Sequence, residues 1–166
     1  GVGGSIEGSA LRCPFHAWKF EGSGRCIEIP YAKRIPPKAA VASWPIQQRN
    51  GLIFAWYDPR SAPPRFELPE LPEWGSPDWT EPELRSFEVK THPQEMAENI
   101  VDAVHFRFVH GTPQIPPMQA ESRGPCFHAS QGLTFTTPKG EAPGRVDVTM
   151  YGPGFGVTRF LGVVET

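Results

Sequence analysis

The chain has 166 residues, of which 39% are hydrophobic, and it carries 18 acidic and 16 basic side chains. A chain of this length buries roughly two thirds of its unfolded surface, which is enough for a packed core. No apolar run reaches the roughly 18 residues of a membrane span, and the first residues lack the basic start and apolar core of a signal peptide. We therefore expect a cytoplasmic protein. Its three cysteines exclude a disulfide scaffold, and its net charge of −2 disfavours nucleic-acid binding.

The charge is unevenly distributed along the chain. Residues 1–65 carry a net charge of +5, and the remaining residues carry −7. Such asymmetry indicates either two units with different surfaces and partners or simply two solvated faces, and both interpretations stay open. On the first interpretation, we expect the basic surface around Lys33, Arg34 and Lys38 to dock an acidic redox partner.

The first 60 or so residues predict a small all-β unit. Short apolar or β-rich runs, at residues 10–11, 26–29 and 52–57, are separated by the turn signals Gly3-Gly4, Gly22-Ser23-Gly24 and Asn50-Gly51. Prolines then crowd residues 59–82, which excludes a helix or a central strand there. We expect a connector that packs over a surface through Trp74 and Trp79.

The second half predicts one helix and several strands. Residues 87–90 suit a strand, and Thr91-His92-Pro93 suits a helix start, because proline is tolerated in the first helical turn. Residues 94–110 contain no helix breaker, and Met96, Ile100, Val104 and Phe108 form an apolar stripe that ends before Gly111. Strands are expected at 133–136, 145–150 and 162–166.

Two local motifs could bind metal. The first is Cys13-Pro14-Phe15-His16, in which a thiolate and an imidazole three positions apart on a tight turn can hold one ion. The alternative is a buried cysteine beside a hydrogen-bonded histidine.

The second motif is Asp102-x2-His105-x4-His110. In a regular helix Asp102 and His105 share a face, whereas His105 and His110 lie about 140° apart. The two imidazoles therefore converge on one ion only if the helix is distorted or ends near His110. Two histidines leave a metal short of ligands, and a carboxylate would complete the triad that binds Fe(II). The alternative places both histidines on the rim of an apolar helix.

Each of the two motifs resembles a metal-binding segment of one known protein family. Cys13-Pro14-Phe15-His16 followed by Trp18 resembles the second ligand loop of a Rieske [2Fe–2S] centre, and Asn99-x2-Asp102-x2-His105-x4-His110 resembles the iron-binding helix of the Rieske non-haem iron oxygenases. The stretch from His92 to His110 looks most like the 3-ketosteroid 9α-hydroxylase and cholesterol 7-desaturase branch. Phe15 stands where respiratory Rieske proteins have a cysteine that forms a disulfide bond. This chain cannot form that disulfide, so it resembles the oxygenase and ferredoxin type.

The resemblance implies a role for each matching residue. Cys13 and His16 would bind the [2Fe–2S] cluster, and His105 and His110 would bind a mononuclear Fe(II). Asp102 would be the electron-transfer bridge, hydrogen-bonded to an iron-bound histidine and, across a subunit boundary, to a cluster-bound one. Trp18 and Phe20 would shield the cluster. Cys26 and Cys126 match no ligand position and are interpreted as structural.

The resemblance also implies a fold and a division of the chain. We expect an α+β fold: the C-terminal part of a small all-β Rieske domain at 1–58, a Pro-rich connector at 59–82, and the start of a helix-grip-like catalytic domain with an antiparallel sheet at 83–166. The family's first cluster ligands, C-x-H, would fall before Gly1, and Asp147 and Glu165 do not stand where the family has its third iron ligand. We therefore expect an internal fragment, inactive alone.

The implied function is that of a terminal oxygenase in a multicomponent Rieske system. It would take electrons from a ferredoxin, an NAD(P)H-dependent reductase or both, use O2 as co-substrate, and hydroxylate or desaturate a small apolar, steroid-like molecule, as a homotrimer. One alternative is a Rieske-type electron-transfer protein without oxygenase activity. Another is a structural zinc protein, which would be colourless where a Rieske cluster is red-brown.

Overall fold

The computed structural model of the protein describes residues 3–162. Two compact units make up the chain, Gly1–Trp79 and Thr80–Thr166. No helix within the described residues is long and apolar enough to cross a membrane.

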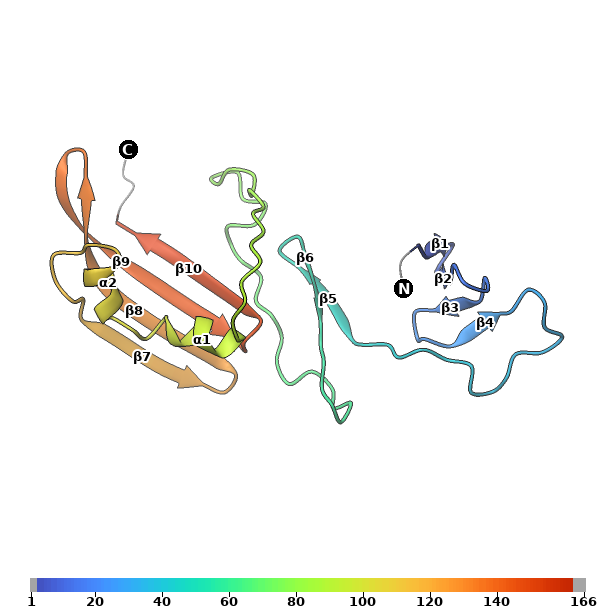
Figure 1. The fold of residues 1–166 in the computed structure, drawn as a ribbon. Coiled ribbons are helices and arrows are strands. Elements are labelled where there is room, and N and C mark those ends of the chain that lie inside the picture. Colours follow the sequence, from blue (N-terminus) through green and yellow to red (C-terminus); the bar gives the residue numbers. More distant parts are fainter. Residues whose placement is uncertain (1–2, 163–166) are drawn as a thin grey trace. The chain divides into compact units, whose positions relative to one another are not determined.

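The first unit begins with a four-stranded antiparallel sheet of order β1-β2-β3-β4 (Figure 1). Its strands have only three residues each: β1 (Ser5–Glu7), β2 (Ala10–Arg12), β3 (Lys19–Glu21) and β4 (Cys26–Glu28). Lys19 Nζ lies 3.0 Å from Glu7 and 2.8 Å from Glu28, and the hydrogen bonds to Glu28 and then Glu7 raise the pKa of Lys19. This ion-paired lysine ties β3 to β1 and β4.

A separate hairpin follows, formed by β5 (Ile46–Arg49) and β6 (Leu52–Ala55). Its turn residues Asn50 and Gly51 have φ of 50° and 71°, the left-handed conformation that a two-residue hairpin of this kind requires. The predicted Asn-Gly turn is confirmed.

The Pro-rich connector packs on this hairpin. The Asn50 side chain accepts a hydrogen bond from the Leu71 amide at 2.9 Å and donates one to the Pro69 carbonyl at 3.0 Å. The Trp74 ring lies over Gly51, where an added Cβ would come within 2.2 Å of the ring. The connector therefore contacts the hairpin through Trp74, as expected, although the Trp74 and Trp79 side chains are 48% and 60% exposed.

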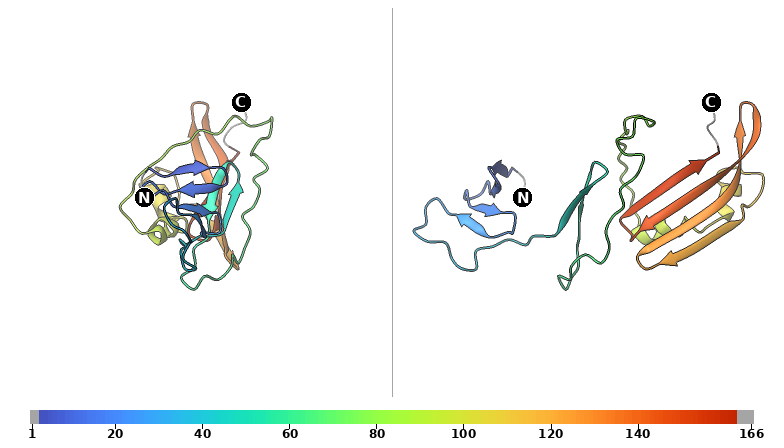
Figure 2. Two further views of the ribbon diagram at one scale, coloured as in Figure 1. Left: turned by 90° about the vertical axis from the view of Figure 1, so that its right-hand side faces the viewer. Right: turned by 180° about the vertical axis from the view of Figure 1, so that it is seen from behind.

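The second unit is a four-stranded antiparallel sheet of order β10-β9-β8-β7, with two short helices, α1 and α2, across one face (Figures 1 and 2). The strands are β7 (Met118–Arg123), β8 (Cys126–Thr137), β9 (Gly140–Tyr151) and β10 (Phe155–Leu161). Leu133, Val146 and Val148 form the core on this face, and Ile100 and Phe106 pack against it.

The single helix predicted over residues 94–110 is wrong. The chain instead forms α1 (Pro93–Glu98) and α2 (Val104–Phe108), separated by a turn. Asp102 explains the break, because its Oδ1 accepts hydrogen bonds from the backbone N–H groups of Val104 at 3.0 Å and His105 at 3.3 Å. A carboxylate that satisfies free N–H groups in this way favours a new helix start.

The apolar stripe expected on that helix is also wrong, because Met96, Val104 and Phe108 are 58%, 48% and 75% exposed. The expected strand at 87–90 is irregular chain. The strands expected at 133–136 and 145–150 lie within β8 and β9. Of the strand expected at 162–166, Gly162 follows β10 and the remaining residues lie outside the described range.

Candidate metal centres

The loop between β2 and β3 carries Cys13 and His16. The Cys13 N–H donates to the Trp18 carbonyl at 2.8 Å, and the Ala17 N–H donates to the Cys13 carbonyl at 3.0 Å. Ala17 has φ of 60°, a conformation that few non-glycine residues adopt. These bonds close a tight turn that holds a half-buried Cys13 and an exposed His16 on one short loop.

Aromatic side chains lie beside this loop. The Trp18 indole Nε1–H donates to the Tyr31 hydroxyl at 2.7 Å, and the Tyr31 ring centroid lies 6.4 Å from that of His16. The Trp18 and Phe20 rings are 6.3 Å apart. Their expected role in shielding a cluster stays a prediction.

The other two cysteines lie elsewhere. Cys26 in β4 is 3% exposed, and its Sγ donates to the Glu28 carbonyl at 3.4 Å. Cys126 is half-buried at the start of β8, and all three cysteines are free thiols. The position of Cys26 in the core agrees with its structural interpretation.

His105 and His110 converge at the end of α2. Their ring centroids are 5.2 Å apart with an interplanar angle of 69°. The helix ends at Phe108, and the His105 carbonyl accepts from the N–H groups of both Val109 at 2.7 Å and His110 at 3.4 Å. The hydrogen bond from the His110 N–H thus spans five residues, more than in a regular helical turn, and Gly111 at φ of 70° follows. The helix end near His110 that the spacing requires is therefore present.

The spacing of the two imidazole rings is compatible with a shared metal ion. His105 Nδ1 contacts the backbone carbonyl of Asp102, which leaves Nε2 available. Metal-bound histidines characteristically donate their second ring N–H to such a carbonyl. With metal–nitrogen bonds of about 2.0–2.1 Å, two adjacent imidazole ligands have ring centroids roughly 4.5–5.5 Å apart, which matches this pair.

A third ligand is not found within the described residues, where no group of three or more histidine, cysteine, aspartate or glutamate side chains is arranged to hold a metal. Asp147 in β9 accepts a hydrogen bond from Ser130 at 2.7 Å and pairs with Arg145 at 2.9 Å. Glu165 lies outside the described range.

Asp102 contacts His105 in an unexpected way. Its Oδ2 is 3.9 Å from His105 Nδ1, beyond hydrogen-bond distance, and the ring contact is made by the Asp102 backbone carbonyl. The carboxylate caps α2 through Oδ1, and its side chain is 54% exposed. Its Oδ2 is therefore free of a hydrogen bond to the His105 ring.

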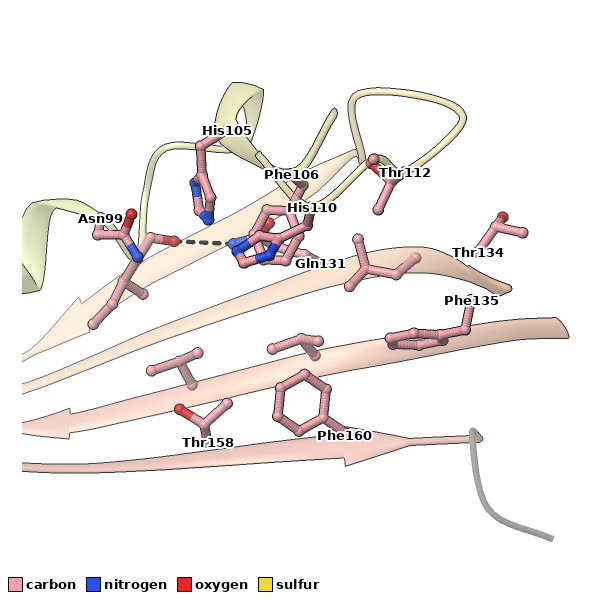
Figure 3. Close-up of a pocket in the computed structure, with 15 residues that line it drawn as sticks. Asn99, His105, Phe106, His110, Thr112, Gln131, Thr134, Phe135, Thr158 and Phe160 are labelled. Atoms are coloured by element: carbon pink, nitrogen blue, oxygen red, sulfur yellow. Dashed lines mark hydrogen bonds between the residues drawn. The ribbon is translucent and has the colours of Figure 1, made fainter. Parts of the chain in front are cut away.

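A cavity of about 500 Å³ lies between α2 and the sheet of the second unit (Figure 3). His105 and His110 line it together with apolar side chains from three strands. The apolar lining residues from the sheet are Leu133, Phe135, Val146, Val148 and Phe160. Two imidazoles at an apolar cavity are suited to hold a metal next to an apolar ligand.

The cavity also contains residues that the sequence analysis missed. Gln131 in β8 is 2% exposed, and its Nε2 donates to the Ile100 carbonyl at 2.9 Å (Figure 3). The sequence pattern that could have identified Gln131 is the alternation of Ala129, Gln131, Leu133 and Phe135. In a strand, this alternation places one polar side chain among apolar ones on the inward face. His92, by contrast, has the expected helix-start role, because its Nδ1 accepts from the Gln94 N–H at 3.1 Å.

Comparisons with known proteins agree with this organisation. A family model of the Rieske [2Fe–2S] domain matches residues 2–45, and one of the 3-ketosteroid 9α-hydroxylase C-terminal domain matches residues 55–165. The first match supports a [2Fe–2S] cluster. The domain boundaries at 58 and 82 stay a prediction.

Two curated proteins illustrate the sequence similarity. A probable 3-ketosteroid-9-alpha-monooxygenase oxygenase component of Rhodococcus rhodochrous is 36% identical over 167 residues, covering 92% of this chain and 41% of that protein. Cholesterol 7-desaturase nvd 1 of Ciona intestinalis is 36% identical over 109 residues, covering 66% of this chain and 23% of that protein. The chain thus spans less than half the length of these relatives.

A solved structure shows the fold. Pseudomonas putida CBB5 NdmA superimposes with a TM-score of 0.61 at 21% identity, over 95% of this chain and 54% of that one. The expected arrangement, a Rieske domain followed by an antiparallel-sheet catalytic domain, is confirmed. The chain belongs to the family of Rieske oxygenases that carry a 3-ketosteroid 9α-hydroxylase C-terminal domain.

Proposed function

We propose that the protein is the terminal oxygenase of a multicomponent Rieske system and acts on an apolar, steroid-like substrate. The observation that carries this proposal is the convergence of His105 and His110, 5.2 Å apart, on a cavity lined mainly by apolar side chains. When bound, the cluster would supply electrons and the mononuclear iron would activate O2 for hydroxylation or desaturation.

The chain's own residues would hold both groups. Cys13 and His16, on the closed β2–β3 turn, supply one thiolate and one imidazole of the set that a Rieske cluster needs. His105 and His110 supply two imidazoles to the iron, with the His105 ring oriented by the Asp102 carbonyl. Further ligands would come from other residues of the full-length protein.

The apolar side chains of the cavity would bind the substrate and exclude water from it. Leu133, Phe135, Val146 and Phe160 provide a surface without charge, which suits a fused-ring hydrocarbon. The curated relatives are named for 3-ketosteroids and cholesterol, which is consistent with this substrate class.

Electrons would come from a ferredoxin, an NAD(P)H-dependent reductase or both. The protein would work as a homotrimer in the cytoplasm, with the cluster of one subunit serving the iron of its neighbour. We place Asp102 at the bridge between them, because its backbone carbonyl contacts the His105 ring while the half-exposed carboxylate leaves Oδ2 available to a cluster-bound histidine of the neighbouring subunit.

The Asp102→Asn variant tests this bridge. Asparagine keeps an Oδ1 that can accept from the Val104 and His105 N–H groups, so we expect α2 and both metal sites to persist. Loss of the carboxylate should lower turnover about 10–100-fold, as is typical of hydrogen-bond partners of metal ligands. Single-turnover oxidation of the prereduced cluster is the measurement.

Glu98→Gln is the matched control, because it makes the same replacement of a carboxylate by an amide, on α1. Glu98 Oε1 accepts a hydrogen bond from Gln94 Nε2 at 2.9 Å, and the amide oxygen of a glutamine can accept the same bond. Turnover of Asp102→Asn within twofold of the control would rule out the bridge.

The basic surface around Lys33, Arg34 and Lys38 would dock the electron donor. All three are exposed, and none takes part in an ion pair within the described residues. Replacing all three by glutamate should slow cluster reduction by about tenfold or more at low salt, because like charges oppose the encounter. Stopped-flow reduction at rising ionic strength should show the difference disappear.

The control reverses the same number of charges on the second unit, at Lys90, Arg123 and Lys139, where we expect the rate to stay near that of the wild type. Equal rates for both triple variants would mean that the donor docks elsewhere.

The decisive test of the proposed function is reconstitution of the full-length protein with a reductase and a panel of apolar steroids. We expect O2-dependent product whose formation is coupled to NAD(P)H oxidation. A protein that cycles its cluster but yields no product with any of them would instead be an electron carrier.

A further inference from the structure

A hydroxyl group lies on the sheet wall of the cavity, across from the two imidazoles. Figure 3 shows His105 and His110 above the sheet and Thr158 rising from β10. Thr158 pairs with Val148 and stands two residues from Phe160, so strand alternation puts its side chain on the face that lines the cavity. Thr158 is exposed, and a ligand in the cavity can therefore reach its hydroxyl.

The Thr158 hydroxyl has a hydrogen to donate. Two other polar side chains of the wall already donate to the protein: Thr112 Oγ1 to the Gln114 carbonyl and Gln131 Nε2 to the Ile100 carbonyl, both at 2.9 Å. By contrast, no hydrogen bond of the Thr158 side chain is found among the residues that the structure describes. Because a threonine hydroxyl is a donor as well as an acceptor, Thr158 offers an unused donor to a ligand.

Two further polar residues line the cavity, but at other places. Asn99 lies next to His105 (Figure 3), so a ligand oxygen bound to it would be close to the imidazoles. Thr134 stands between two residues of β8 that face the core, so its side chain starts from the opposite face of the strand. Thr158 is therefore the donor on the inward face of the sheet that lies away from the histidines.

We propose that Thr158 orients the substrate by donating a hydrogen bond to a ketone oxygen at one end of a steroid. The carbons remote from that ketone would then face His105 and His110. The inference rests on the proposed function and narrows its substrate class to ketone-bearing steroids. A ketone can only accept, so it pairs with this donor, and the apolar wall would contact the rings. Holding the steroid at one end selects the carbon that reacts, because reaction requires the reacting atoms to be correctly placed.

The test measures the binding of two steroids to the full-length protein. One is a 3-ketosteroid without another polar group, and the other is the same skeleton without the 3-oxygen. Thr158→Val keeps the shape of the side chain and removes the hydroxyl, and valine is favoured in strands, so β10 should persist. We expect the dissociation constant of the ketosteroid to rise about three- to tenfold in this variant, as for the loss of one hydrogen bond. That of the deoxygenated steroid should stay within about twofold.

Three more variants complete the binding experiment. Thr158→Ser keeps a hydroxyl and should bind the ketosteroid within about twofold of the wild type. Thr158→Ala removes the hydroxyl in a second way, and the ratio of the two constants should change as in Thr158→Val. Thr149→Val is the matched control on the neighbouring strand β9. Alternation with Val148 puts Thr149 on the opposite face, where its Oγ1 lies 3.1 Å from His128 Nδ1, so the ratio should stay at the wild-type value.

The position of oxidation is a second readout. A ketosteroid held by Thr158 should give one main product, and Thr158→Val should oxidise additional carbons of the same steroid at unchanged iron content. A residue that only supported the fold would lower the amount of product without changing the position of oxidation.

An equal change for both steroids in Thr158→Val, no change for either, or a single unchanged product would overturn the role of Thr158. The proposed oxygenase function would then remain intact, because the wild type would still bind and oxidise the ketosteroid. Failure of the wild type to bind either steroid would contradict the proposed function itself, and the role of Thr158 with it.

Discussion

Replacing His105 or His110 with alanine is expected to remove the mononuclear iron and to lower steroid turnover by more than about 100-fold. Changes to groups that only orient a metal ligand typically cost 10–100-fold, so loss of a ligand should cost more. The cluster would lie on the β2–β3 loop of the first unit, and its visible absorbance should therefore be unchanged. Iron analysis should show a loss of about one atom per chain, with the remaining iron held in the cluster.

Two other histidines provide controls for this experiment. His92→Asn keeps an acceptor for the Gln94 N–H at the start of α1. His128→Gln keeps a polar group near Thr149 Oγ1, which lies 3.1 Å from His128 Nδ1. Both variants should retain iron and turnover. If His105→Ala and His110→Ala also retain them, the protein does not bind iron between these imidazoles, and the electron-carrier interpretation would gain support.

Replacing Cys13 or His16 with alanine is expected to abolish the [2Fe–2S] cluster. Each would supply one of the four ligands, and no other free thiol lies on the same loop within the described residues to replace Cys13. The red-brown colour and the EPR signal of the reduced protein should both disappear, and NAD(P)H-dependent turnover should fall to background because the iron receives no electrons.

His16→Cys gives a finer measurement of the same site. It keeps a ligand but replaces an imidazole with a thiolate, and a cluster with more thiolate ligands has a lower reduction potential. The potential should therefore fall by at least about 100 mV if the cluster assembles. Cys126→Ser, on β8, is the control and should keep the wild-type spectrum. A colourless wild-type protein that contains zinc would contradict both expectations.

Local sequence patterns predicted the parts of the fold that depend on a few neighbouring residues. The Asn50-Gly51 turn follows from the left-handed backbone that these two residue types tolerate. The helix start at His92-Pro93 follows from the missing N–H of proline and a side chain that caps the first turn. Both are settled within four residues of chain, where tertiary contacts have little influence.

The division of residues 94–110 into two helices could not be predicted from the sequence. Hydrophobic periodicity assumes an uninterrupted helix and does not report side chains that compete for backbone hydrogen bonds. Asp102 binds the N–H groups of Val104 and His105 and starts α2 anew. The change in direction presents Ile100 and Phe106 to the sheet and leaves Phe108 75% exposed. The break between α1 and α2 therefore changed which residues of this segment are buried against the sheet.

By itself, the sequence determined which residue types stand at ligand spacing, and with them the family resemblance, because Cys13, His16, His105 and His110 lie in two short segments. Only the tertiary structure decided how the histidines meet and what they face. Their convergence depends on a widened turn after Phe108, and the cavity depends on side chains from three strands and α2. The buried amide of Gln131 is held by a hydrogen bond to the Ile100 carbonyl, 31 positions away, and contacts over such distances are set by packing rather than by local pattern.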